Sequence, residues 1–197
     1  WNTNKEVEIS LDETKSIKDN ANKFYKLYNK SKNSSLKLHE LEEKTLEDIK
    51  YLEEILFSIE EADSMDILKD IAEEIKEEKT PKQESVILEE EFNGYKILIG
   101  RSNKQNDLIV SKLSDKDDLW FHTKDCAGSH VLLKNTLKKE IEDEVILHCA
   151  KLAKQYSKAK LTSKAGVIYT YRKNLKKPPA SNLGYVTYKN ETEILVD

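Results

Sequence analysis

The sequence predicts an α+β protein, in which a helical coiled-coil arm precedes a compact domain of mixed helices and strands. Two observations lead to this prediction. Over the first 80 residues, apolar side chains recur every three or four positions, as they do along one face of a helix. From Ser85 onward the apolar residues instead form short runs of four to eight positions bounded by turn residues, as strands do. The change of period marks two structural regions.

A helix is expected after Ser10-Leu-Asp-Glu13, which fits the capping-box pattern. Lys32-Asn-Ser-Ser35 is either a break between two helices or a weak point in one longer helix. The apolar spacing around it is that of a helix packed against a neighbouring helix, either within one chain or between chains. The positions on this face are Thr14, Ile17, Ala21, Phe24, Tyr28, Leu38, Leu41, Thr45, Leu52, Ile55 and Ile59.

A further helix is predicted through Met65 to Ile75, with a cap at Asp63-Ser64. Pro81 disfavours helix at the preceding residue, and the surrounding segment is polar. We therefore predict a helical coiled-coil (middle) region at 1–79, a linker at 80–85 and an α+β domain at 86–197.

In the second region, Asn93-Gly94 separates two apolar runs and predicts a two-residue hairpin turn. A short helix is expected at 106–113, and an amphipathic helix with Cys149 on its buried face at 141–156. The remaining strands are predicted at 119–123, 129–133, 166–172, 185–188 and 193–196, the last two joined as a hairpin by Lys-Asn-Glu-Thr.

Charge is distributed unevenly along the chain. Residues 1–80 contain 13 Lys/Arg and 21 Asp/Glu, whereas residues 124–189 contain 14 basic and 5 acidic side chains. A basic region of this kind favours a polyanionic partner such as nucleic acid. Two cysteines make no disulfide framework, and no apolar run reaches the ~18 residues of a membrane helix. We expect a cytoplasmic protein without a membrane partner.

The stretch Asp117–His130 combines several chemically active side chains. His122, Asp125, Cys126 and His130 are possible zinc ligands, but their spacing matches no standard zinc motif. Cys126 beside an imidazole could act as a nucleophile, although no oxyanion site is evident. The simpler interpretation is two strands joined by a tight turn. We expect no cofactor, no metal and no catalytic residue.

Trp120 has two interpretations, as a buried core residue or as an exposed ring that stacks on unpaired bases. In the second, aromatic and imidazole rings share a surface with lysines that follow the phosphates. The predicted RNA-binding residues are Trp120, His122, Lys124, His130, Lys164, Arg172, Lys173, Lys176 and Lys177.

Asp118-Leu-Trp-Phe-His-Thr-Lys-Asp125 followed by Gly128-Ser-His-Val131 resembles the signature of the RNA-binding domain (NFACT-R) of the NFACT family, also known by the older name fibronectin-binding protein A. The resemblance extends to further segments. Cys126-Ala127 and Ile168 depart from the family pattern, which has Ile-Pro and Asp there. The further segments are Asn20–Lys30, Tyr51–Glu54, Gly100–Asp107, Tyr156–Ala159, Val167–Thr170 and Lys176–Pro178.

The resemblance implies a factor of ribosome-associated quality control. Family members bind large ribosomal subunits obstructed by peptidyl-tRNA, engage tRNA and rRNA, and support C-terminal alanine tailing of stalled chains. Their coiled-coil arm reaches a protein at the base of the ribosomal stalk, and peptide-bond chemistry belongs to the ribosome. The alternative is a surface-exposed adhesin that binds fibronectin, as the older family name suggests.

Overall fold

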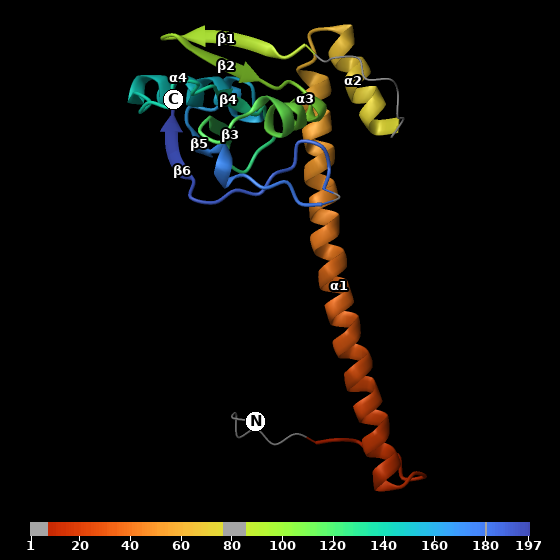
Figure 1. Ribbon diagram of the computed structural model, residues 1–197. Coiled ribbons are helices and arrows are strands. Elements are labelled where there is room, and N and C mark those ends of the chain that lie inside the picture. The colour runs from red at the N-terminus through yellow and green to blue at the C-terminus, as the bar shows by residue number, and fades with distance from the viewer. Residues whose placement is uncertain (1–7, 77–85, 180) are drawn as a thin grey trace. The chain divides into compact units, whose positions relative to one another are not determined.

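The computed structural model describes residues 8–76, 86–179 and 181–197 (Figure 1). Contacts divide the chain into two compact units, Trp1–Asp48 and Ile49–Asp197. The linker predicted at 80–85 lies outside the described residues. The predicted domain boundaries at 79 and 86 therefore stay predictions.

Helix α1 (Ile17–Glu60) is one continuous helix, which confirms the longer-helix alternative at Lys32–Ser35. Its first turn is capped by Ser16, whose hydroxyl accepts a hydrogen bond from Asp19 N at 3.1 Å and donates to Asp19 Oδ2 at 2.6 Å. The cap predicted at Ser10 is therefore wrong. The buried Asn20 side chain binds the backbone N–H and carbonyl of Asp12, which folds the preceding residues into a turn.

Within the first unit, Asn20 is the one buried side chain among the described residues 8–48. The apolar side chains that predicted a coiled coil, such as Phe24 and Leu38, are 40% and 65% exposed. These described residues include no second helix beside α1. Pairing of this helix stays a prediction.

Helix α2 (Met65–Lys76) belongs to the second unit and confirms the helix predicted there. The Ser64 hydroxyl accepts a hydrogen bond from Ile67 N at 3.4 Å, as the predicted cap requires. Ile67 and Ile71 pack against Ile55 near the end of α1. The two helices therefore share a small apolar core.

One antiparallel sheet forms the body of the second unit, with the strand order β1-β2-β4-β3-β5-β6 (Figure 1). Asn93 and Gly94, with φ of 49° and 77°, make the predicted turn between β1 and β2. The strands are β1 (Leu88–Phe92), β2 (Tyr95–Ile99), β3 (Leu119–Thr123), β4 (Val131–Leu133), β5 (Ala165–Tyr171) and β6 (Thr192–Val196).

The sheet is covered on both faces. Alternate residues such as Leu119 and Phe121 pack against helix α4 (Asp143–Gln155), where Cys149 is buried as predicted. The intervening residues, including Trp120, pack against the π-helical turn η1 (Ile109–Leu113), which continues helix α3 (Asn103–Leu108). Two hydrophobic cores thus sandwich the central strand β3.

Two predicted elements differ from the structure. The short helix begins at Asn103 rather than at residue 106, because the buried Ser102 caps it by accepting a hydrogen bond from Gln105 N. Residues 185–188 form no regular strand, so the predicted hairpin with 193–196 is wrong. Instead Thr187 exchanges two backbone hydrogen bonds of 2.8 Å with Lys176, and β6 pairs with β5. Among the helices of the described ranges, none is long and apolar enough to cross a membrane.

Candidate nucleic-acid interface

The signature residue Trp120 lies inside the second unit, with 1% of its surface exposed. Its ring stacks on that of His122 with centroids 5.8 Å apart, and meets the ring of His130 edge-on at 5.2 Å. The ring of Tyr188 is the fourth member of this cluster, with its centroid 5.9 Å from that of Trp120. Of the two alternatives for Trp120, the structure supports the core residue, because no ring face is available to a base.

The two signature histidines also make contacts within the domain. His122 Nε2 lies 3.2 Å from the carbonyl oxygen of Gly128, and the backbone N–H of the buried His130 donates to Asn106 Oδ1 at 3.0 Å. Burial lowers the pKa of His122 and holds the pKa of His130 well below its usual range. A lowered pKa favours the neutral form of both rings at pH 7. His130 is 4% exposed, so its ring is not available for the predicted stacking on an unpaired base, whereas His122 is partly exposed.

The metal and nucleophile alternatives gain no support from the geometry around the turn. Asp125 takes a φ of 57° in the tight turn that the sequence predicted. In the portion of the chain that the structure describes, no three His, Cys, Asp or Glu side chains are grouped so that they could hold a metal ion. Gly128 sits so close to Ser157 that an added Cβ would lie 2.7 Å from the serine Cβ.

Four of the predicted basic residues already have partners within the protein. Arg172 Nε donates to the Val110 carbonyl and to Ser114 Oγ, both at 2.8 Å, so its side chain anchors the chain after β5. Each of the three lysines forms an ion pair. The pairs are Lys124 with Glu193 at 2.6 Å, Lys164 with Asp197 at 3.8 Å, and Lys177 with Asp107.

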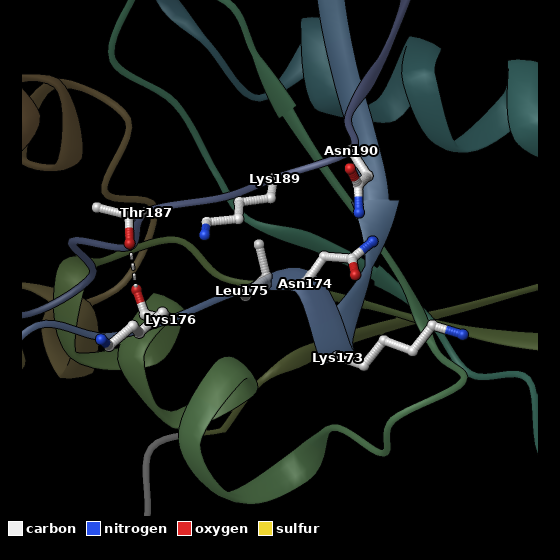
Figure 2. A pocket seen from close by; sticks show the side chains of 7 residues that line it. All are labelled: Lys173, Asn174, Leu175, Lys176, Thr187, Lys189 and Asn190. Carbon is white, nitrogen blue, oxygen red and sulfur yellow. Dashed lines mark hydrogen bonds between the residues drawn. The ribbon is translucent and has the colours of Figure 1, made fainter.

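The other two predicted basic residues, Lys173 and Lys176, border a pocket of about 380 Å³ (Figure 2). Lys189 joins them from the opposite side of the pocket. None of these three ammonium groups pairs with a carboxylate of the described residues, although Lys173 Nζ lies 4.9 Å from the centre of the Tyr171 ring. We call this site the basic pocket; it is lined by Lys173, Asn174, Leu175, Lys176, Thr187, Lys189 and Asn190.

The basic pocket is held in shape by buried contacts. Leu175, 6% exposed, packs in the core around Trp120. The Thr170 hydroxyl, 3% exposed, accepts a hydrogen bond from Asn174 Nδ2 at 2.9 Å and lies 3.0 Å from the Lys189 carbonyl, to which it donates. One threonine of β5 thereby ties both walls of the pocket together.

Five residues that line the pocket were not predicted from the sequence, namely Asn174, Leu175, Thr187, Lys189 and Asn190. Lys189 and Asn190 were assigned to a hairpin turn and Thr187 to a strand. The signal that could have found them is a cluster of lysine and asparagine in both Arg172–Lys177 and Thr187–Asn190. Nothing local in the sequence indicates that these two segments face each other.

Together the fold and this site define an α+β protein that presents unpaired cations around a small polar pocket, a surface suited to polyanions. Two family descriptions match the chain: "NFACT protein RNA binding domain" over residues 86–190 and "NFACT N-terminal and middle domains" over residues 1–90. The chain belongs to the NFACT family, as its motifs predict.

Curated relatives agree with this membership. The chain is 32% identical to the Rqc2 homolog RqcH of Bacillus subtilis, over 96% of this chain and 35% of that protein. It is 34% identical to the Rqc2 homolog RqcH of Streptococcus suis, over 98% of this chain and 36% of that protein. The chain thus spans about a third of the length of these relatives.

A solved structure shares the fold. The C-terminal part of the fibronectin/fibrinogen-binding protein from Streptococcus suis superimposes with a TM-score of 0.82 at 33% identity, covering 93% of this chain and 77% of that one. The α+β fold with a long amino-terminal helix is therefore the fold of this chain as well as of a solved relative.

Proposed function

We propose that this chain is the RNA-binding and ribosome-docking part of a cytoplasmic quality-control factor. The factor binds obstructed large ribosomal subunits and tRNA, and supports C-terminal alanine tailing of stalled nascent chains. The observation that carries the proposal is the basic pocket, which is bordered by three lysines without an ion pair to a described carboxylate and lies inside the segment that matches the family's RNA-binding domain.

The physical basis is phosphate neutralisation. Each lysine that contacts a phosphate releases condensed counterions, so that binding weakens as salt is raised. The ion-paired Lys124, Lys164 and Lys177 would first have to leave their carboxylates, whereas the three pocket lysines are available at no such cost. The chemistry of tailing belongs to the ribosome in this proposal, and the chain contributes binding alone.

Helix α1 suits the second part of the proposal, docking to a protein at the base of the ribosomal stalk. The family resemblance assigns this contact to the coiled-coil arm. Apolar side chains along the first unit, including Phe24, Leu38 and Leu41, are 40% to 65% exposed. They offer contact area either to a partner helix or to that protein.

The test compares two variants that each lose three positive charges. One replaces Lys173, Lys176 and Lys189 with Ala. The matched control replaces three lysines at exposed positions that do not line the basic pocket and form no ion pair with a described carboxylate: Lys76, Lys151 and Lys158. Lys76 lies on α2, Lys151 lies on α4 across the sheet, and Lys158 lies in the 3-10 turn η2 (Lys158–Leu161) after α4.

For tRNA and for purified large subunits, we expect the pocket variant to bind at least tenfold more weakly in low salt, and the control variant to bind within a factor of about two of the parent. The slope of log affinity against log salt should fall by about 2 in the pocket variant, at roughly 0.7 per lost phosphate contact on single strands. An equal loss of affinity in both variants would show that RNA binds by general charge attraction and that the basic pocket is not a specific site.

The alternative function, binding of fibronectin, is supported by the name of the Streptococcus suis protein whose structure matches. Immobilised fibronectin and tRNA can be offered to the same protein preparation. Saturable binding to fibronectin that the pocket variant leaves unchanged, together with no binding to tRNA or large subunits, would favour the adhesin.

A further inference from the structure

We propose that the basic pocket holds one unpaired nucleotide of RNA, with the phosphates on the three lysines and the edge of the base on Asn174 and Asn190. This inference rests on the proposed function and deepens it, because it names single-stranded RNA as the ligand. Binding to phosphates alone would make no distinction between single strands and duplexes.

The size of the pocket fits one nucleotide. Its volume of about 380 Å³ is near the lower end of the range in which small-molecule sites of proteins fall, ~300 to 1,000 Å³. Its two walls are joined by the paired backbones of Lys176 and Thr187, so they cannot separate without losing two hydrogen bonds. Two paired nucleotides, with twice the bulk of one, exceed this space.

The pocket also contains unused hydrogen-bonding groups. Asn174 donates one N–H to Thr170, which leaves its carbonyl oxygen and its second N–H available. The side-chain amide of Asn190 makes no hydrogen bond within the described ranges, and Figure 2 shows it facing the amide of Asn174. Two amides supply both donors and acceptors, the combination that reads the edge of an unpaired base.

Two of the lysines lie where the backbone of such a nucleotide would run, because Lys176 and Lys189 come from opposite walls of the pocket (Figure 2). Lys173 borders the pocket, but its side chain extends away from these two, with Nζ 4.9 Å from the centre of the Tyr171 ring, and reaches a bound phosphate only after rotation about its side-chain bonds. Leu175 lies at the bottom of the pocket and closes it, since only 6% of its surface is exposed. Cations around the rim and amides within together match a nucleotide better than a bare phosphate.

Substituting Asn190 tests the inference without removing a charge. Asn190 has a φ of 51°, a conformation that glycine adopts readily, so Asn190→Gly removes the amide and keeps the backbone. The hydrogen bond from Thr170 to this segment involves backbone carbonyls and is retained. Asn182→Gly, at an exposed position that does not line the pocket, is the matched control.

Fluorescence anisotropy would measure binding of each protein to a labelled 12-nucleotide RNA, as a single strand and as a duplex with its complement. We expect the parent to bind the single strand more tightly than the duplex. Asn190→Gly should weaken single-strand binding by roughly tenfold, the effect of one or two lost hydrogen bonds, and should leave duplex binding unchanged. Asn182→Gly should match the parent, and urea unfolding midpoints of both variants would establish that they are folded.

Two results would overturn the inference and leave the proposed function standing. They are equal binding of single strand and duplex by the parent, and an Asn190→Gly variant that binds the single strand as the parent does. In either case the loss of binding after substitution of the three lysines would still identify a phosphate site. A parent protein that binds neither RNA, nor tRNA, nor large subunits would overturn both the inference and the proposed function.

Discussion

At the scale of single residues, the signature stretch stabilises the domain. The buried Trp120 and His130 form a ring cluster with the partly exposed His122. Asp118, 1% exposed, binds Lys134 Nζ at 2.5 Å and the backbone N–H of Asn135 at 2.9 Å. A buried carboxylate with several donors is costly to disturb. The family motif therefore builds the scaffold that positions the basic pocket, and the pocket residues themselves lie further along the chain.

Replacing Trp120 with Ala should destabilise the protein without a direct effect on RNA binding. Removing a fully buried indole leaves a large cavity, so we expect the free energy of unfolding to fall by about 3 to 5 kcal/mol. Urea denaturation measures this loss, and affinity for tRNA, corrected for the folded fraction, should stay within about twofold of the parent. Tyr185→Ala, at a side chain 45% exposed, serves for comparison and should lose under about 1 kcal/mol. Weak binding by fully folded Trp120→Ala protein would restore the stacking interpretation.

Glu54 makes the stability of the second unit depend on pH. Its carboxylate oxygen Oε2 accepts a hydrogen bond from Gly128 N at 3.2 Å, and burial raises the pKa of Glu54 from 4.5 to about 7. Because the folded state holds this proton more tightly than the unfolded state, the contribution of Glu54 to stability is complete below about pH 4.5 and is lost as pH rises through about 7. The decrease amounts to roughly 3 kcal/mol at most.

Glu54→Gln should remove this dependence, since the amide oxygen still accepts the hydrogen bond but does not ionise. At pH 8 the variant should be more stable than the parent by about 1 to 3 kcal/mol, and at pH 4.5 the two should be nearly equal. Urea unfolding at both pH values measures the difference. Glu60→Gln, at an exposed position of the same helix, should follow the parent at both pH values, and identical pH profiles for all three proteins would refute the role of Glu54.

At the scale of elements, the segment after β5 contains two kinds of basic side chain, one that stabilises the turn and one that is available to a ligand. The 3-10 turn η3 (Arg172–Asn174) places Arg172 inward, on Val110 and Ser114, and Lys173 outward, at the rim of the basic pocket. Adjacent basic residues that look equivalent in the sequence thus have different roles. One holds the turn, and the other is available to a ligand.

Arg172→Ala and Lys173→Ala should therefore differ in their free energy of unfolding, whereas both should bind tRNA more weakly than the parent. We expect Arg172→Ala to lose about 1.5 to 3 kcal/mol, because two hydrogen bonds from a half-buried charged group disappear. Lys173→Ala should stay within about 0.5 kcal/mol of the parent. Both should bind tRNA more weakly, one through a displaced turn and the other through a lost cation. Equal stability of the two variants in urea would contradict the anchoring role of Arg172.

Most elements could be predicted from the sequence where local patterns decide them, as for the Asn93-Gly94 turn and β3. Errors arose where distant residues compete with local signals. Asn20 binds the backbone of Asp12 and thereby moves the helix cap to Ser16. Thr187 pairs with Lys176, eleven residues earlier, rather than within a hairpin. The basic pocket could not be predicted because its two walls are joined by the Lys176–Thr187 pair and by the Thr170 hydroxyl, contacts that no local pattern indicates.

At the scale of the whole molecule, the contacts and the sequence divide the chain differently. The sequence predicts a boundary near residue 80, whereas the contacts place Ile49–Asp197 in one unit. Six side chains from the end of α1 through α2 bind the sheet domain. Their contacts are Glu54 with Gly128, Glu61 with Lys160, Asp63 with Arg101 at 2.6 Å, Asp70 and Glu73 with Lys104 at 2.7 and 3.0 Å, and Glu74 with Asn103 at 3.2 Å. Phe57 lies between Glu54 and Glu61 in the sequence, and its ring is buried, with 6% of its surface exposed.

Two truncations distinguish these boundaries. A chain of residues 49–197 keeps every contact just described, so we expect it to unfold cooperatively with a urea midpoint close to that of the parent. A chain of residues 86–197 loses them all and should be less stable by about 2 to 4 kcal/mol, since a buried Phe is worth ~1.5 to 3 kcal/mol and each partly exposed ion pair ~0 to 1 kcal/mol. Equal stability of the two truncations would mean that α2 and the end of α1 pack on the sheet domain without stabilising it. A lower midpoint for 49–197 than for the parent would assign a stabilising role to the first unit.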